Sequence, residues 1–485
     1  MRIARLMDER GKVVSGLLLA AWWAGCVAAG IAAHLASPPS TLVLWLVAAC
    51  VPYAAWLARD AELPRKHALG LVITAALPMI LAPAGLSDDV YRFLWDGRVW
   101  THGIDPYLYA PSDPALHPLR DALWRNINHP DVPTIYPPVA QLLFGLVGAL
   151  WHSVIAMRLL AFVGHLVVGW SLSLRSRRAS LAWWLNPLAL SESALGAHLD
   201  VWVGLAVLAF AWALHDGRVR RAIGLVFVAS GLKLVGLVLA PLVAIRSRRW
   251  APVAVAVAAL PLLPLLGAGS GSHTTGGLGQ YARRWEGNAG AFALVKGATH
   301  AALETAEVAP GRVRFDTLRP TLERVHETRW DPRASFSPEK KPIHDVAEFE
   351  THVVASLLTR ALVALTVLVL AIVLALRRVE PMRATHAVLL VVLLLAPQIH
   401  PWYLLWLLPL HLALGRRALV VWSVAILAAY APLDHWLAAR EWQQSTWVSF
   451  VQYAIVAFAL AVEILPGEKR AADNGETREL SPRAV

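Results

Sequence analysis

The chain has 485 residues, of which 57% are hydrophobic and only 16% are charged, and its formal net charge is +11. A soluble core of this length could not bury so much apolar surface, so the composition predicts an integral membrane protein. Of the 44 lysines and arginines, 25 fall in eight short clusters between apolar runs: 1–12, 59–66, 175–178, 218–221, 246–249, 377–383, 416–417 and 469–483. This spacing indicates cytoplasmic segments of a membrane protein and argues against nucleic acid as a partner.

The first three apolar segments, 14–36, 41–58 and 67–84, predict three membrane crossings that carry the chain from the cytoplasm to the outer face. The first segment is too long for the apolar region of a signal peptide, so we expect it to remain as an anchor. Residues 87–138 then form a first extracytoplasmic loop, in which seven carboxylates face four basic residues. A charged loop of this size beside the membrane is a candidate reaction site.

The remaining apolar segments predict crossings, hairpins and one interrupted region. Residues 135–174 consist of two apolar pieces broken between Trp151 and Arg158, one of which we expect to be re-entrant or interfacial. Residues 222–245 and 384–414 predict compact hairpins, the first with Lys233 near its outer tip and the second with 397–403 at its outer turn. The other predicted crossings are 180–197, 200–215, 250–268, 353–376, 418–433 and 446–465.

These segments predict an all-α polytopic membrane protein with a single transmembrane domain over residues 1–485. We expect a bundle of about 13 hydrophobic helices, some of them short or re-entrant. Two large loops, 87–138 and 269–351, are expected to be extracytoplasmic, and the tail 466–485 is expected to be cytoplasmic and disordered. Cys26 and Cys50 both lie in apolar runs, so neither a disulfide framework nor a thiol metal site is expected.

The start of the first loop is predicted to form a helix over residues 88–100 that lies on the membrane. At about 100° per residue, this helix has an apolar arc and an opposite charged arc that contains Asp88, Asp89, Arg92 and Asp96. The carboxylates are expected to face outward. They are either solvated and paired with Arg92, or one of them is a partly desolvated general base.

Other candidates lie in the later segments. Lys233 occupies the middle of an apolar hairpin, where an ammonium group is costly without a partner or water, so it is either a snorkelling lysine or a ligand of a lipid phosphate. Glu192, His198 and Asp200 border an outer turn, where they either line a sugar pocket or cap and pair with one another. The spacing of His198 and Asp200 is too ordinary to predict a metal site.

Aromatic residues are expected on the outer side. The 22 tryptophans fit interfacial belts there, for example Trp95, Trp100, Trp124, Trp402 and Trp442. A second interpretation is that some rings stack on a sugar, and the candidates for this role are Trp95, Tyr107, Tyr136 and Trp402. Taken singly, each ring is more typical of a belt residue.

Several runs carry a family resemblance: SDDVYRFLWDGRV (87–99), GIDPYLYAP (103–111), NPLALSESALGAHLD (186–200), GLKLVGLVLAPL (231–242), YARRWEGNAGAF (281–292) and HPWY (400–403). They resemble the GT-C superfamily of glycosyltransferases. More narrowly, they are similar to the bacterial polyprenyl-phosphate-mannose-dependent alpha-mannosyltransferases and related membrane glycosyltransferases. The first-loop acid motif and the late HPWY are the most specific parts.

The resemblance implies a multi-pass enzyme of the cell (inner) membrane with its active site on the extracytoplasmic face. It would move a hexose, with mannose as the expectation, from a polyprenyl-phosphate donor to a glycan or glycolipid acceptor by a single inverting displacement, without a metal or other cofactor. The general base would be Asp89 first and Asp88 second. The donor phosphate and sugar would be bound by Arg92, Lys233, His400, Arg283, Arg284, Trp402 and Tyr403. The acceptor or sugar pocket would contain Glu192, His198, Asp200 and Tyr136.

Two other functions stay open from the sequence. A lipid-linked-sugar flippase or transporter would favour ionisable residues near the middle of the membrane and two similar halves, whereas the polar residues here concentrate at one face. A non-catalytic membrane subunit of polysaccharide assembly has no sequence feature that separates it from an enzyme.

Overall fold

The computed structural model describes residues 2–59, 61–83, 85–267, 277–278, 286–305, 346–439 and 445–464. Within these ranges the regular elements are helices, apart from one β-bridge between Gly287 and Gln398. Seven of the described helices are long and apolar enough to cross a membrane. The predicted all-α, multi-span fold class is therefore confirmed, and the tail 466–485 and most of the loop 269–351 lie outside the described residues.

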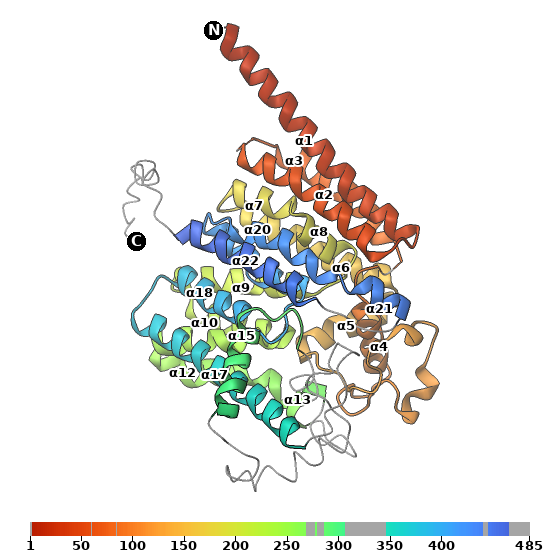
Figure 1. The fold of residues 1–485 in the computed structure, drawn as a ribbon, viewed down its shortest axis with the longest axis vertical. Coiled ribbons are helices and arrows are strands. Elements are labelled where there is room, and N and C mark those ends of the chain that lie inside the picture. The colour runs from red at the N-terminus through yellow and green to blue at the C-terminus, as the bar shows by residue number, and fades with distance from the viewer. Residues whose placement is uncertain are drawn as a thin grey trace.

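The first three helices pack together as one layer at the edge of the bundle (Figure 1). They are α1 (Arg2–His34), α2 (Pro39–Ala58) and α3 (Arg65–Leu81). Small residues allow their backbones to approach closely, as is common between membrane helices. A side chain at Gly30 of α1 would place its Cβ only 2.9 Å from the Met79 backbone nitrogen of α3.

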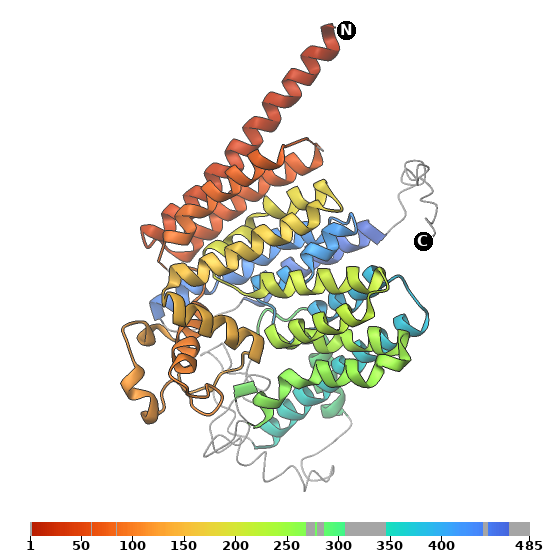
Figure 2. The ribbon, with the colours of Figure 1, turned by 180° about the vertical axis from the view of Figure 1, so that it is seen from behind.

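A second layer brings together segments that are far apart in sequence (Figures 1 and 2). Its members are α6 (Val154–Ser173), α7 (Arg177–Trp184), α8 (Pro187–Ala194), α20 (Ala418–Ala425), η7 (Ile426–Tyr430) and α22 (Thr446–Ile464). Local capping fixes where α6, α7 and α8 begin, since side-chain oxygens of Ser153, Ser176 and Asn186 each accept a backbone N–H of the first turn. A short helix, α21 (Leu433–Ala439), follows η7.

The third layer contains both predicted hairpins. The first is α10 (Val219–Leu232), η3 (Leu234–Leu239) and α11 (Ala240–Arg246), with Lys233 at the turn. The second is α18 (Pro381–Leu394), η6 (Pro401–Trp406) and α19 (Leu408–Ala413). Around them lie α9 (Asp200–His215), η4 (Arg248–Trp250), α12 (Ala251–Ala259), η5 (Leu260–Leu262), α13 (Leu263–Gly267), α15 (Ala291–Thr305) and α17 (Val346–Leu376).

The first polar loop, residues 87–138, forms a separate lobe at one end of the bundle (Figure 1). It contains the predicted helix as α4 (Asp89–Thr101), followed by η1 (Pro114–Leu119) and η2 (Leu123–Asn126). The next helix, α5 (Pro138–Leu150), starts with proline at its first position, where the missing N–H costs nothing. It packs on α4, and the predicted break before α6 falls at residues 151–153.

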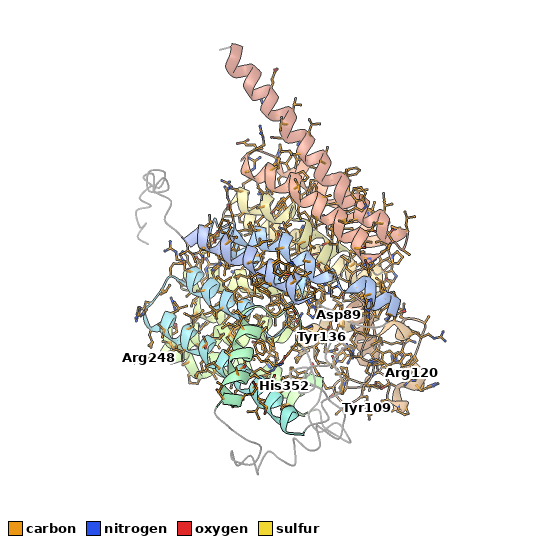
Figure 3. All side chains as sticks on the ribbon, in the orientation of Figure 1. Asp89, Tyr109, Arg120, Tyr136, Arg248 and His352 are labelled. Atoms are coloured by element: carbon orange, nitrogen blue, oxygen red, sulfur yellow. The ribbon has the colours of Figure 1, made fainter. Side chains whose placement is uncertain are left out.

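The basic clusters meet at the opposite end of the bundle, which we call the basic end (59–66, 175–178, 215–221, 246–249 and 377–383). Contacts that join different clusters are Arg177 to the Leu63 carbonyl at 2.9 Å, Arg175 to Asp216 at 2.8 Å and His215 to Glu380 at 2.8 Å. Figure 3 shows Arg248 at this end, and Arg120 and Tyr109 in the polar lobe. Five of the eight segments predicted to be cytoplasmic therefore share one end of the fold, and the cluster 469–483 lies outside the described residues.

The predicted outer belt of tryptophans is only partly present. Trp100 is 43% exposed, but Trp95 and Trp402 are 3% and 6% exposed and belong to the core. The belt prediction is wrong for these two residues because the polar loop and the turn 397–403 fold inward onto the bundle. Trp442 lies outside the described residues.

Candidate active site

Two adjacent carboxylates stand at the N-terminus of α4. Asp88 precedes the helix and Asp89 is its first residue, where the helix dipole favours negative charge. The Asn128 amide donates to Oδ1 of Asp88 at 2.6 Å and to Oδ1 of Asp89 at 3.2 Å. One side chain of the polar loop thus ties both carboxylates together. The Asp89 side chain stays 22% exposed, and its other oxygen faces His198.

A buried histidine and carboxylate lie behind Asp89. Nε2 of His198 is 4.0 Å from Oδ2 of Asp89, and Nδ1 of His198 is 2.9 Å from Oε2 of Glu192. The second oxygen of Glu192 accepts the Tyr430 hydroxyl at 2.7 Å. His198 and Glu192 are only 1% and 2% exposed. The sequence left open whether Glu192, His198 and Asp200 line a pocket or pair with one another; in the structure His198 and Glu192 lie within ion-pair distance, while Asp200 lines a cavity and pairs with Lys233.

The HPWY turn stacks on this pair. The Trp402 ring lies 3.9 Å from the His198 ring and 4.3 Å from the His400 ring, nearly parallel to both. Nε2 of His400 is 2.5 Å from Nε2 of Gln398. Burial, and then the neighbouring Lys233 and His198, lower the pKa of His400 to about 3. His400 is therefore a neutral hydrogen-bonding group at neutral pH.

A second cluster surrounds Lys233. Its ammonium is 2.8 Å from Oδ1 of Asp200, and the same oxygen accepts the Trp406 indole N–H at 2.6 Å. The ammonium also lies 4.7 Å from the centre of the Tyr403 ring, within range of a cation–π interaction. Because Asp200 is only 4% exposed, Lys233 has a buried counter-ion.

A small, mostly apolar cavity adjoins the Lys233 cluster. Its lining consists of Phe93, Tyr136, Ala140, Phe144, Leu199, Asp200, Val203, Leu232 and Lys233. Burial raises the pKa of the Tyr136 hydroxyl well above its ordinary value, and Asp89 and Asp200 raise it further. Tyr136 lines the cavity together with Asp200 and Lys233, and Figure 3 shows it near Asp89. Its hydroxyl keeps its proton and makes no hydrogen bond with the described residues.

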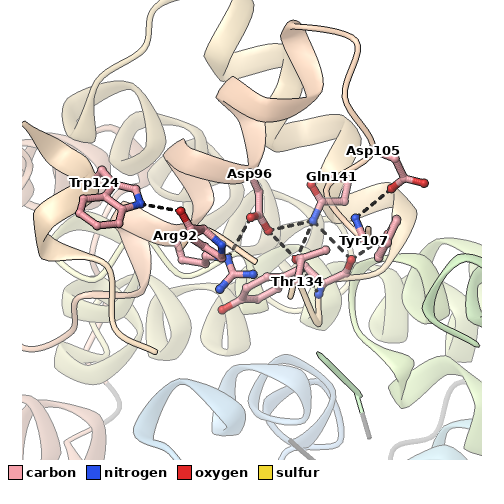
Figure 4. Close-up of polar contacts among 9 residues, drawn as sticks. Arg92, Asp96, Asp105, Tyr107, Trp124, Thr134 and Gln141 are labelled. Atoms are coloured by element: carbon pink, nitrogen blue, oxygen red, sulfur yellow. Dashed lines mark hydrogen bonds and ion pairs between the residues drawn. The ribbon is translucent and has the colours of Figure 1, made fainter. Parts of the chain in front are cut away.

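The inner face of α4 is covered by polar side chains of the loop (Figure 4). Asp96 accepts hydrogen bonds from Arg92 at 2.9 Å, from Thr134 at 2.5 Å and from Gln141 at 3.0 Å. The prediction that the carboxylates face outward is wrong for Asp96, which is 2% exposed, because residues 130–138 fold over that face. Arg92 is buried with it, at 7% exposed. Among the described residues, Nη2 of Arg92 has no hydrogen-bond partner.

Three residues whose hydrogen bonds position the candidate site were not predicted from the sequence. Asn128 and Tyr430 gave no signal, since they lie 39 and 238 residues from the carboxylates that they contact. Arg158 gave one, because an arginine within an apolar segment needs partners. It is completely buried and donates to carbonyls of Ala82, Pro83 and Leu195, which fastens the end of α3 to the turn before His198.

Two predicted ligands cannot be located in the same way, since Arg283 and Arg284 lie outside the described residues. Over the described ranges, no group of three or more His, Cys, Asp and Glu side chains is arranged to hold a metal ion. The candidate site therefore consists of the Asp89–His198–Glu192 cluster, the HPWY turn and the Lys233–Asp200 cluster.

Comparison with known proteins points to one family. Residues 10–249, about half of the chain, match the family described as alpha-(1->6)-mannopyranosyltransferase, N-terminal domain. This range contains Asp89, Glu192, His198 and Lys233, and it ends before the HPWY turn.

A curated relative gives the same result. Alpha-(1->6)-mannopyranosyltransferase A of Corynebacterium glutamicum is 27% identical over 230 residues, which cover 42% of this chain and 46% of that protein. The chain thus spans about half the length of the relative it matches. No solved structure matches this chain. The family match and the relative agree with the motifs described above, and together they support a GT-C-like mannosyltransferase family for this chain.

Proposed function

We propose that this chain is a membrane glycosyltransferase that transfers a hexose, specifically mannose, from a polyprenyl-phosphate donor to a glycan or glycolipid acceptor, with inversion at the anomeric carbon. The family match and the relative support the reaction class and the sugar. The observation that carries the proposal is the half-buried Asp89 carboxylate, which faces His198 at the end of the bundle opposite to the basic end.

Asp89 is the proposed general base. It takes the proton of the acceptor hydroxyl while that oxygen attacks the anomeric carbon. The bond from the anomeric carbon to the phosphate oxygen breaks at the same time, and its electron pair leaves with the lipid phosphate. The Asn128 hydrogen bonds hold the carboxylate in position, and Asp88 is the second candidate for the base. General-base assistance of this kind contributes roughly 10²–10⁴-fold to the rate.

The leaving phosphate gains negative charge as the bond breaks, so fixed cations and hydrogen-bond donors stabilise the transition state more than the ground state. Lys233 is the first candidate, because its ammonium lies beside the cavity and retains donor capacity beyond Asp200. Arg92 is the second, through its unpaired Nη2. His400, neutral at the pH of the reaction, contributes a hydrogen bond and no charge.

The sugar and the acceptor are proposed to lie between the two clusters. The protonated Tyr136 hydroxyl is a donor for sugar oxygens, and Trp402 and Tyr403 flank the same region. Glu192, His198 and Asp200 form the inner wall, where each already has a partner. The apolar lining of the cavity, with Phe93 and Phe144, suits the C–H faces of a hexose or the first isoprene unit of the donor.

The orientation is also a proposal. We place the basic end in the cytoplasm, in agreement with the excess of lysine and arginine expected there. The loops 87–138 and 269–351, and with them the active site, then face the outside of the cell (inner) membrane. The seven long helices and four shorter apolar helices of the described residues belong, in this proposal, to the expected bundle of about 13 hydrophobic helices. The reaction as proposed needs no metal ion.

The test is a transfer assay with protein in lipid nanodiscs. Radiolabelled polyprenyl-phosphate-mannose and an extracted lipid-glycan fraction are supplied, and transfer of label to the glycan is measured. We expect transfer by the wild type and a loss of roughly 10²–10⁴-fold in kcat for Asp89→Asn. Asp113→Asn is the matched control, because Asp113 lies on the same loop and its side chain only caps η1.

The outcomes separate the competing functions. Sealed vesicles in which labelled lipid crosses the membrane without transfer would replace the enzyme with a flippase. A protein that neither transfers nor translocates in the presence of donor and acceptor would favour the assembly subunit. Activity of Asp89→Asn within a few-fold of wild type, with Asp88→Asn inactive, would move the base to Asp88.

A further inference from the structure

The buried pair of His198 and Glu192 has no role in the displacement step itself. Nε2 of His198 lies 4.0 Å behind Oδ2 of Asp89, the proposed base. Glu192 lies on the other side of the His198 ring. A buried carboxylate is costly unless it is paired and hydrogen-bonded. Glu192 accepts the Tyr430 hydroxyl on one oxygen, and its other oxygen lies within ion-pair distance of Nδ1 of His198. The wall of a sugar pocket alone would not require a buried carboxylate beside a buried histidine.

The surroundings of His198 favour one tautomer. Nδ1 lies 2.9 Å from a carboxylate oxygen of Glu192 without the alignment of a hydrogen bond, and a hydrogen on Nδ1 is favoured because this oxygen, which can only accept, would repel a lone pair there. Nε2 then presents a lone pair toward Oδ2 of Asp89. The separation of 4.0 Å is longer than a hydrogen bond, so His198 does not hold Asp89 in the resting state. A protonated Asp89 would have a donor to offer this lone pair, which the ionised carboxylate lacks.

We infer that His198 and Glu192 form a proton relay that returns Asp89 to its ionised form after each transfer, an inference that rests on the proposed function. Asp89 takes the proton from the acceptor hydroxyl and passes it from Oδ2 to Nε2 of His198. The resulting imidazolium keeps its Nδ1 hydrogen and is balanced by the Glu192 carboxylate. The proton then leaves to water or to the departing lipid phosphate, and His198 becomes neutral again. No oxidant or other co-reactant is needed.

The surroundings allow His198 to change charge. Glu192 from α8 and Asp89 from α4 offer it negative charge, and Asn128 joins Asp88 to Asp89. Trp402 covers the flat face of the ring and can stabilise an imidazolium through its π system. The other titratable groups nearby are His400, stacked on Trp402, and Tyr430, which holds Glu192.

Chemical rescue tests the relay. His198→Gly opens a space beside Trp402 and should lower kcat by about 10²-fold or more, in the range of general acid–base effects. We expect added imidazole to restore transfer, with rescue that depends on the basicity of substituted imidazoles. A histidine with a purely structural role would not show this dependence, because packing is insensitive to the pKa of the added base.

Glu192→Gln tests the role of Glu192 in the relay, and this test does not depend on space for added imidazole. A glutamine amide can donate to Nδ1, so the hydrogen of His198 would move to Nε2 and block proton acceptance from Asp89. We expect a loss in kcat of roughly 10²-fold with little change in the KM for the donor lipid. The pH profile of kcat should change as well, because the imidazolium loses its counter-charge.

The control is His165, a completely buried histidine of α6 whose Nε2 lies 3.2 Å from the Trp184 carbonyl. His165→Gly should retain transfer and show no response to imidazole. A folded His198→Gly that imidazole does not rescue, or Glu192→Gln with wild-type kcat and pH profile, would overturn the relay. These failures leave the proposed function intact as long as the wild type transfers label and Asp89→Asn does not. Absence of wild-type transfer would count against the proposed function itself.

Discussion

The ion pair of Lys233 and Asp200 shows how one residue can be required for both folding and chemistry. Asp200 is 4% exposed and accepts from Lys233 and from the Trp406 indole. Removal of the ammonium would leave a buried carboxylate without its counter-ion, which is strongly destabilising, whereas removal of both charges is often nearly neutral. Loss of activity in a single Lys233 variant therefore does not by itself reveal a phosphate ligand.

A double variant separates the two roles. We expect Lys233→Met to lower the free energy of unfolding by about 3 kcal/mol and to abolish transfer. The combination of Lys233→Met with Asp200→Asn should recover most of that stability, because the buried charge is gone, and still lack activity, because the cation beside the phosphate is missing. Unfolding in mixed detergent micelles and the transfer assay measure both effects. Recovery of transfer in the double variant would show that Lys233 is structural only.

His400 gives a prediction about pH and stability. Its pKa in the folded protein is about 3, below the ordinary unfolded value of about 6.5, so the folded state resists protonation. The stabilisation is fully present above pH 6.5 and is lost as the pH falls from there toward 3. At 1.36 kcal/mol per unit, the wild type should lose about 2 kcal/mol at pH 5 through this group.

His400→Gln removes the titration and serves as the reference. Thermal unfolding of both proteins in detergent, from pH 7.5 to pH 5, measures the difference between them. We expect the difference in free energy of unfolding between the wild type and the variant to fall by about 2 kcal/mol between pH 7.5 and pH 5. A constant difference would mean that His400 is accessible enough to be protonated in the folded protein.

At the scale of elements, two glycines decide how α4 sits on α5. A Cβ at Gly97 would lie 2.2 Å from the Phe144 carbonyl oxygen, and one at Gly145 would lie 2.0 Å from the Trp100 ring. The first clash is with backbone, so α4 itself would have to move. Because Asp89 begins this helix, the position of the proposed base depends on a contact two turns away.

Gly97→Ala should therefore lower both stability and activity. Overpacking of this kind typically costs 1–3 kcal/mol, and a small shift of Asp89 would reduce kcat by a larger factor than it changes the KM. Gly224→Ala is the matched control, because a Cβ at this helical position of α10 meets nothing within 4 Å, and alanine is the better helix former. Equal behaviour of the two variants in unfolding and transfer assays would contradict the proposed dependence.

The sequence predicted most of these elements and few of their contacts. Apolar length and basic ends were enough to locate the helix 88–100, the break near Trp151 and the hairpin turns at Lys233 and 397–403, because these depend on local pattern. The covering of Asp96 was missed, since Thr134 and Gln141 lie 38 and 45 residues away and no periodicity links them. Pairing of Glu192 with Tyr430 likewise depends on how distant helices pack. The pairing of His198 with Glu192 was one of the alternatives from the sequence, whereas its position 4.0 Å from Asp89 was not foreseen.

For the whole molecule, the separation between the basic end and the candidate site has a physical consequence. Lysine and arginine resist transfer across the membrane, so the basic end fixes the orientation of the bundle. The Lys233 turn and the HPWY turn lie at the other end of short helices that start from it, α10 and α18. Both turns, with the candidate phosphate ligands Lys233 and His400, then lie toward one membrane surface, where the proposed lipid-linked donor would present its headgroup.

Cysteine labelling tests this orientation, and the chain is well suited to it. The native thiols Cys26 and Cys50 are 0% and 2% exposed, so they should react little with a membrane-impermeant maleimide. Leu108 in the polar lobe is 39% exposed, and Arg218 at the basic end is exposed as well. In spheroplasts we expect Leu108→Cys to be labelled from outside and Arg218→Cys only after permeabilisation. The wild type is the background control. Labelling of Arg218→Cys in intact spheroplasts, with Leu108→Cys protected, would place the site in the cytoplasm, where a nucleotide sugar would replace the lipid-linked donor.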